Sequence, residues 1–146
     1  MNEQPVPLFL APMAGVTDLA YRLLARECGA DLSITEFTAA SGLSRHDASS
    51  WLKVESDPRE KPFIPQIFGG DISEMVSTVE LLEHKADIID INFGCPAPKV
   101  CRNNAGAALL RSPDQVIEMV RSCINATNLP ITVKMRLGTG SGPNTA

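Results

Sequence analysis

The fold of this chain is decided by the stretch DIIDINFGCP, residues 87–96. In its first six residues, 87–92, the apolar side chains Ile88, Ile89 and Ile91 lie almost next to one another, as expected for a strand that is covered on both faces. A glycine and a proline follow, so the strand ends in a loop. Strands buried on both faces occur in parallel sheets flanked by helices, and this stretch therefore predicts an α/β fold.

Alternating strand and helix patterns extend from this stretch in both directions. Apolar runs predict five strands, at residues 7–11, 32–37, 63–68, 87–92 and 131–136. Helices are predicted at residues 17–28 with Thr17 as N-cap, from Asp71 or Ser73 onward, at residues 113–127, and as a short helix within residues 38–50. Residues 53–61, 94–112 and 138–144 are predicted to be loops. These elements fit either a complete doubly wound sheet or part of a (β/α)8 barrel, which needs about 250 residues.

The carboxyl ends of the five strands favour the barrel. At or near each of these ends lies a side chain with a functional group that could bind a ligand: Met13, Glu36, Gln66, Asn92 and Lys134. In barrel enzymes that end of the strands faces the active site. Packing alone does not explain one such group on every strand. We therefore predict a (β/α)8 TIM barrel, of which residues 1–146 supply the N-terminal portion, the first five strands and about four helices.

Composition and charge limit the classes of protein to consider. The 146 residues are 44% hydrophobic and 21% charged, as in soluble globular proteins. No apolar run reaches the ~18 residues that span a bilayer, and the N-terminus lacks a secretory signal, so we expect a cytoplasmic protein without a membrane partner. The formal charge of −4 is unlike that of most nucleic-acid binders. Any RNA-binding surface must then be local or lie outside this sequence.

The four cysteines show no metal-ligand spacing, and we predict no metal site. In a reducing compartment they are expected to be free thiols. Cys28 and Cys123 lie within predicted helices and are interpreted as buried structural residues, as is Cys101 in its loop. Cys95 differs because it directly follows a strand end, and it is the candidate for chemistry.

Six short motifs in the chain resemble those of the tRNA-dihydrouridine synthase family. In order they are APMAGVTD (11–18), PQIFG (65–69), NFGCP (92–96), KV (99–100), GAALL (106–110) and VKMR (133–136). The resemblance runs from about Leu8 to Gly138. The cysteine motif with its Lys-Val and Gly-x-x-Leu-Leu continuation is the specific part, whereas the Ala-Pro-Met opening is shared with other flavin barrels. The resemblance implies an FMN-binding (β/α)8 barrel followed by a small helical domain that grips tRNA.

The resemblance also implies a reaction, the reduction of the 5,6 double bond of uridine in tRNA. Reduced FMN gives a hydride to carbon 6, and an acid protonates carbon 5. Cys95 matches that acid, a role that suits a thiol because it can lose and regain a proton near neutral pH. Asn92 matches the residue that hydrogen-bonds the substrate base. NADPH is the expected reductant of the flavin.

Four residues match family positions that bind the cofactor. Pro12 and Met13 match residues that pack on the flavin ring, and Gln66 matches the one that hydrogen-bonds its pyrimidine edge, which needs both a donor and an acceptor. Lys134 matches a lysine held against the reduced, anionic flavin. A lysine inside an apolar strand requires a partner, which favours this role. Arg136 lies on the same strand face and is predicted to support substrate or cofactor binding.

Other polar residues have weaker assignments. Lys99 occupies a family motif position, and Lys99 and Arg102 are candidates for contacts with tRNA phosphates, although solvated loop charges are the competing interpretation. His46 and His84 are interpreted as surface residues. Glu36 has no assigned role.

The FMN phosphate site of such barrels lies near strands seven and eight, beyond the fifth strand. The family's later histidine, its glycine-rich phosphate loop and the C-terminal tRNA-binding domain are also absent from the 146 residues. We therefore expect a fragment or truncated product that binds FMN poorly and self-associates through open strand edges.

Two alternatives remain open. A free-pyrimidine reductase, such as a dihydroorotate or dihydropyrimidine dehydrogenase, also places an acid after an Asn-rich strand end. The motifs at 99–100 and 106–110 favour the tRNA family instead. A non-catalytic remnant that binds RNA or a partner is favoured by the truncation, but the intact Asn92, Cys95 and Lys134 oppose it.

Overall fold

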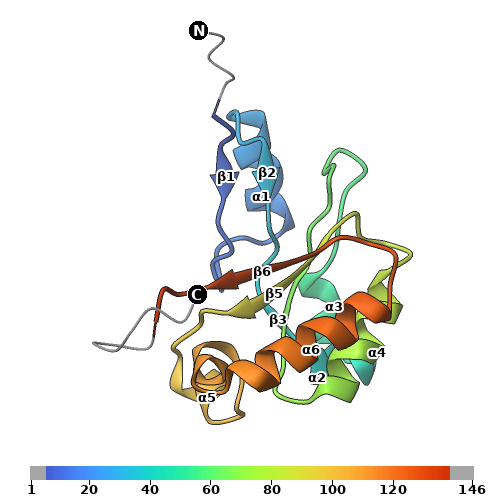
Figure 1. Cartoon of the computed structure of the whole chain (residues 1–146). Coiled ribbons are helices and arrows are strands. Elements are labelled where there is room, and N and C mark those ends of the chain that lie inside the picture. The colour runs from blue at the N-terminus through green and yellow to red at the C-terminus, as the bar shows by residue number, and fades with distance from the viewer. Residues whose placement is uncertain (1–5, 139–146) are drawn as a thin grey trace, which may run out of the picture.

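The computed structural model of the chain describes residues 6–138, in which parallel strands alternate with helices (Figure 1). The strands are β1 (Phe9–Leu10), β2 (Leu32–Ser33), β3 (Thr38–Ala39), β4 (Gln66–Phe68), β5 (Ile89–Phe93) and β6 (Ile131–Met135). The helices are α1 (Leu19–Glu27), α2 (Ala40–Ser44), α3 (Ala48–Lys53), α4 (Ile72–Leu82), α5 (Pro98–Cys101) and α6 (Pro113–Asn125), with a 3-10 helix, η1 (Gly106–Arg111), before α6.

The order of the strands in space follows their order in the sequence. β1 and β2 form a two-stranded sheet, and β3-β4-β5-β6 form a four-stranded sheet, with every pairing parallel. A doubly wound sheet reverses its strand order at a switch point, whereas a barrel adds each strand beside the preceding one. The sequential order therefore confirms the barrel prediction for the described residues and excludes the doubly wound alternative.

The second strand differs from its prediction. Residues 32–37 were expected to form one strand, but β2 and β3 are separate short strands, and β3 lies beyond Phe37. A single parallel bridge between Ile34 and Ile64 connects the segment between them to the chain before β4. The two short strands thus pair with different neighbours, β2 with β1 and β3 with β4.

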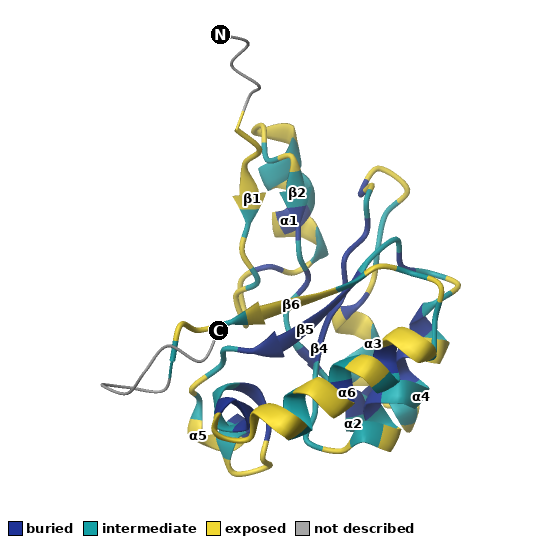
Figure 2. Cartoon of the chain, viewed as in Figure 1, coloured by how far each residue is buried: buried dark blue, intermediate teal, exposed yellow. Residues whose placement is uncertain are grey.

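The core lies between the four-stranded sheet and the helices. Side chains alternate along β5, and Ile89, Ile91 and Phe93 join one apolar cluster with residues of α4 and α6, including Met75 and Met119. Figure 2 shows that β5 is buried along its whole length, while β6 is mostly exposed. The polar residues of β5 must therefore face away from the helices, toward the inside of the partial barrel.

Helix starts follow local capping chemistry. Asp18, not Thr17 as expected, caps α1, because its side chain accepts a hydrogen bond of 2.8 Å from the backbone N–H of Tyr21. Asp71 caps α4 in the same way, as one of the two predicted starts. Pro113 opens α6 as predicted. Residues 94–112 are not a simple loop, since they contain α5 and η1.

A buried ion pair connects the first βα unit to the rest of the fold. Arg22 of α1 and Glu60, in the predicted loop at residues 53–61, are both 0% exposed. Arg22 donates to both carboxylate oxygens of Glu60, at 2.5 and 3.0 Å. Ser33 of β2 also donates to Glu60, at 3.1 Å. Hydrogen-bonded pairing of this kind is what makes a buried charge tolerable.

The structure bears on two further expectations. Within residues 6–138, no helix is both long and apolar enough to cross a membrane. The loop predicted at residues 138–144 lies outside the described residues except for Gly138, and so does the extreme N-terminal stretch, residues 1–5.

Candidate active site

Polar side chains from three adjacent strands gather on the inner face of the sheet. The strand register pairs Gln66 of β4 with Asp90 of β5, Asp90 with Thr132 of β6, and Asn92 with Lys134. Gln66, Asp90 and Asn92 are 0%, 3% and 7% exposed, although all three are strongly polar. Buried polar groups require partners, and these residues provide them for one another.

The inner-face side chains form one continuous chain of hydrogen bonds. Asp90 accepts from Thr132 Oγ1 and from Gln66 Nε2, each at 2.6 Å. Gln66 Oε1 accepts from Asn92 Nδ2 at 3.1 Å, and Asn92 Oδ1 accepts from the backbone N–H groups of Gly94 and Cys95 at 2.9 Å. A carboxylate only accepts and a backbone N–H only donates, so both ends of the chain fix the orientation of the two amides.

The backbone of Cys95 is held on both sides. Its N–H is bound by Asn92, and its carbonyl accepts a hydrogen bond of 2.9 Å from the N–H of Ala107 in η1. Gly106 allows this approach, because it has φ +60° and an added Cβ would lie 2.7 Å from the Cys95 carbonyl oxygen. Arg136 Nε donates to the carbonyl of Gly94 from the other side. The half-buried thiol therefore sits on a fixed loop at the carboxyl end of β5.

Pro12 and Met13 lie in a separate loop, between β1 and α1. The backbone N–H of Met13 donates to Thr17 Oγ1 at 3.0 Å and is therefore not free to bind a ligand. The residue is 38% exposed, so its thioether is the group available for contact. Glu36, which had no assigned role, accepts a hydrogen bond of 2.9 Å from the N–H of Gly15. Glu36 thereby fixes the Met13 loop to the chain between β2 and β3.

Lys134 occupies a different environment from the one expected. It was predicted to lie inside an apolar strand, but it is exposed, since β6 has no further strand beside it among the described residues. The burial argument for a partner is therefore wrong. No ion pair of Lys134 is found within residues 6–138. Its register partner Asn92 places it on the same inner face as the amide chain.

The structure brings together Gln66, Asn92, Cys95 and Arg136 through the contacts above, with Lys134 beside them. Lys99 is not part of this group, because it is exposed on α5 and lines a pocket to which none of these residues contributes. Sequence reasoning did not assign Asp90, although its alternation with isoleucines on a buried strand was a usable signal.

The remaining cysteines and histidines separate into exposed and buried groups. All four cysteines are free thiols. Cys123 is fully buried, and burial raises its pKa to about 11. Cys28 was expected to be buried as well, but it is the C-cap of α1 and is exposed. The half-buried Cys101 donates its thiol to the carbonyl of Cys95 at 3.6 Å.

His46 and His84 are exposed, as predicted. Within the part of the chain that the structure describes, no three His, Cys, Asp or Glu side chains are grouped to hold a metal ion.

Comparison with known proteins places this geometry in a family. The sequence model of the dihydrouridine synthase (Dus) family matches residues 9–145. A probable tRNA-dihydrouridine synthase of Rhizobium leguminosarum bv. phaseoli is 41% identical over 130 residues, covering 88% of this chain and 41% of that protein. A tRNA-dihydrouridine synthase B of Pseudomonas aeruginosa is 40% identical over 135 residues, covering 92% of this chain and 41% of that protein. The chain spans about two fifths of the length of these curated relatives.

Proposed function

The chain belongs to the dihydrouridine synthase family, and from this premise we propose that it carries the proton-donating centre of an enzyme that reduces uridine in tRNA to 5,6-dihydrouridine. The observation that carries the proposal is the fixed position of Cys95. Asn92 binds its N–H and Ala107 binds its carbonyl, each at 2.9 Å. Both contacts hold the thiol at the carboxyl end of the strands, where barrel enzymes place their chemistry.

Cys95 contributes the proton of the reduction. A bound, reduced flavin supplies the hydride for carbon 6 of the base; FMN is the proposed flavin and NADPH its proposed reductant. The Cys95 thiol gives its proton to carbon 5, so that one hydride and one proton saturate the double bond. The resulting thiolate regains a proton from solvent, which the half-buried side chain can reach.

The inner face has the groups that the polar edge of a flavin requires. Gln66 and Asn92 each use one amide hydrogen within the hydrogen-bond chain, so each amide nitrogen retains a second donor. Lys134 provides an exposed ammonium on the same face, which would stabilise negative charge on a reduced flavin. Pro12 and Met13 would pack against the ring, where a polarizable thioether suits a flat aromatic face.

The same amides and one arginine suit the substrate. Asn92 would donate its remaining hydrogen to the uridine base, close to the thiol that it positions. Arg136 is exposed and keeps guanidinium hydrogens free beyond the one that it donates to Gly94. A tRNA substrate and NADPH imply that the enzyme works in the cytoplasm.

The test replaces Cys95 in the complete gene. In cells that lack the endogenous gene, wild-type protein should restore dihydrouridine in tRNA, and Cys95→Ala should lower the rate by about 10²- to 10⁴-fold, the usual contribution of a general acid. Cys101→Ala, in the same loop, is the matched control and should restore the modification. Unchanged dihydrouridine with Cys95→Ala would remove the catalytic assignment. Reduction of free uracil or orotate in preference to tRNA would instead indicate a free-pyrimidine reductase.

A further inference from the structure

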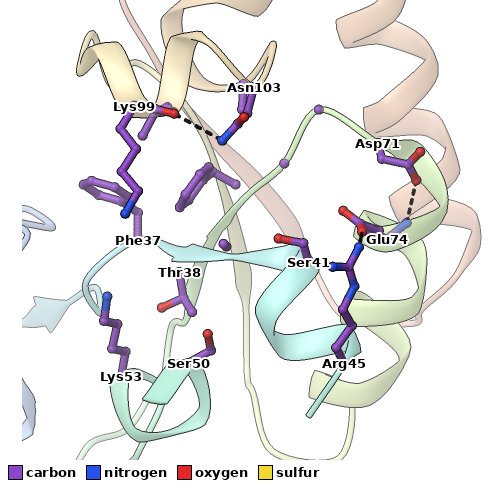
Figure 3. Close-up of a pocket in the computed structure, with 16 residues that line it drawn as sticks. Phe37, Thr38, Ser41, Arg45, Ser50, Lys53, Asp71, Glu74, Lys99 and Asn103 are labelled. Atoms are coloured by element: carbon purple, nitrogen blue, oxygen red, sulfur yellow. Dashed lines mark hydrogen bonds and ion pairs between the residues drawn. The ribbon is translucent and has the colours of Figure 1, made fainter. Parts of the chain in front are cut away.

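A pocket lies near the carboxyl ends of β3, β4 and β5, separate from the Cys95 contacts (Figure 3). Its volume is about 690 Å³, and its walls come from α2 and α3, from the turn between β4 and α4, and from α5. We propose that this pocket binds the sugar-phosphate backbone of the RNA strand next to the target uridine. The inference rests on the proposed function and adds to it a binding site for the substrate.

Two lysines supply the charge for such a site. Lys53 at the end of α3 and Lys99 on α5 approach from opposite walls, and Figure 3 shows both side chains extending into the space near Phe37. Neither lysine forms an ion pair among the described residues. Two ammonium groups that converge without a carboxylate partner are suited to a shared phosphate.

The other charged side chains of the pocket are Arg45, Glu74 and Asp71. Arg45 donates to Glu74 at 2.7 Å. Asp71 accepts from the N–H of Glu74 at 2.9 Å and from Ser73 Oγ at 2.5 Å as the cap of α4. Arg45 and Glu74 therefore neutralise each other, whereas Asp71 keeps its negative charge at the start of α4. With three cations against two carboxylates, the pocket retains an excess of positive charge, which Lys53 and Lys99 supply.

The remaining walls favour a nucleotide over a free inorganic anion. The rings of Phe37 and Phe68 line the pocket and pack edge to face, with centroids 5.4 Å apart. Aromatic walls beside a basic groove are typical of sites for single-stranded nucleic acid, because every base has a face that can stack. The amide of Asn103 adds a neutral group that can both donate and accept at the rim.

The position of the pocket relates it to Cys95. Lys99 lies on α5, whose N-cap Ala97 follows Cys95 by two residues. A strand that presents one base to Cys95 would pass over α5 with its next phosphates. A local pair of lysines also explains how a chain of net charge −4 can contact RNA.

The test compares two double variants of the protein made from its complete gene and purified with its flavin. Lys53→Ala with Lys99→Ala should weaken tRNA binding. It should also reduce the magnitude of the negative slope of log affinity against log salt concentration by about 0.7 to 0.9 per lysine. Arg59→Ala with Lys61→Ala removes the same charge before β4, at the opposite end of the strands, and should change the slope less. Equal melting temperatures would show that both variants fold.

Each outcome decides the proposal. Wild-type affinity and slope in the Lys53/Lys99 variant would overturn it. A raised KM for NADPH in flavin reduction, with unchanged tRNA binding, would assign the pocket to a dinucleotide and also overturn it. Weakened tRNA binding supports the site even if Cys95→Ala leaves dihydrouridine unchanged, in which case only the proposed reaction fails.

Discussion

Asp90 accepts a hydrogen bond of 2.6 Å from the side-chain amide of Gln66, and through Gln66 and Asn92 it is connected to the backbone of Cys95. Asp90 makes no direct contact with the cysteine loop in this chain of hydrogen bonds. It acts at a distance, because its two acceptor oxygens determine which way the Gln66 amide must point. Asp90 is therefore a positioning residue for the proposed proton donor.

Replacing Asp90 tests whether it positions Cys95 through this chain of hydrogen bonds. Asp90→Leu removes the acceptor of the Gln66 amide nitrogen. The Gln66 amide can then rotate so that its nitrogen, instead of its oxygen, faces the amide nitrogen of Asn92, and the hydrogen bond between the two side chains is lost. We expect faster hydrogen exchange at the N–H groups of Gly94 and Cys95 and a stability loss of about 1–3 kcal/mol. Asp90→Asn should retain most of the protection, because its oxygen can still accept from Gln66 while Thr132 Oγ1 accepts from its nitrogen. Equal exchange rates in wild type and Asp90→Leu would contradict the positioning role of Asp90.

Gly106 should be intolerant of any side chain. Gly106→Ala introduces a Cβ at 2.7 Å from the Cys95 carbonyl oxygen in a residue with φ +60°. Backbone strain of this kind costs about 1–3 kcal/mol of stability. The clash should also displace the Cys95 loop and thereby lower the rate of tRNA reduction. Gly29→Ala is the matched control, since Gly29 has φ +102° but nothing lies within 4 Å of the added Cβ. Urea unfolding and tRNA reduction measure the two effects, and equal losses in both variants would rule out the steric contribution.

The buried ion pair should contribute more to stability than an exposed one. Glu60→Ala leaves the Arg22 guanidinium buried without its carboxylate, and breaking a buried pair in this way costs about 3–5 kcal/mol. Lys61→Ala removes one partner of the exposed pair with Asp87 and should cost less than about 1 kcal/mol. Urea denaturation followed by circular dichroism provides both free energies. A loss below 1 kcal/mol for Glu60→Ala would show that solvent reaches the pair.

The cysteines should differ in reactivity with iodoacetamide at pH 8. Cys28 is exposed and should be alkylated quickly. Cys123 should resist alkylation, because it is buried and its pKa is raised to about 11, so its reactive thiolate is scarce until the pH approaches that value. Mass spectrometry of the labelled peptides gives each rate. Rapid labelling of Cys123 in the folded protein would show that α6 opens frequently, whereas labelling only in urea is the expected result.

A polypeptide limited to the 146 residues should self-associate and bind FMN poorly. Its two outermost described strands expose apolar side chains, with Phe9 of β1 55% exposed and Val133 of β6 41% exposed. Unpaired strand edges promote association between chains. Val133→Lys should reduce the association measured by sedimentation velocity. Ile117→Lys, on the exposed face of α6, places the same charge away from an edge and should have a smaller effect. A monomeric wild-type chain with stoichiometric flavin would refute this expectation.

Much of the fold followed from local patterns. The closely spaced isoleucines of residues 87–92 predicted β5 to within a residue or two, because such spacing is typical of a strand covered on both faces. Asp71 and Pro113 marked helix starts through capping chemistry that involves only near neighbours. Residues 94–112 were less predictable, since α5 and η1 depend on contacts such as the one between Ala107 and Cys95.

By itself, the sequence determined the family and most of the strand and helix succession, and it predicted Cys95 as the reactive one of four thiols, because these depend on residue types and their spacing. The tertiary structure alone decided which alternative fold those strands form, since strand order arises from long-range pairing. It also decided that Asp90 orients Gln66, that Glu36 holds the Met13 loop, and that Lys53 faces Lys99 across a pocket. Lys53 and Lys99 lie far apart in the sequence, and only the packing of α3 and α5 around the strand ends brings their charges to one site.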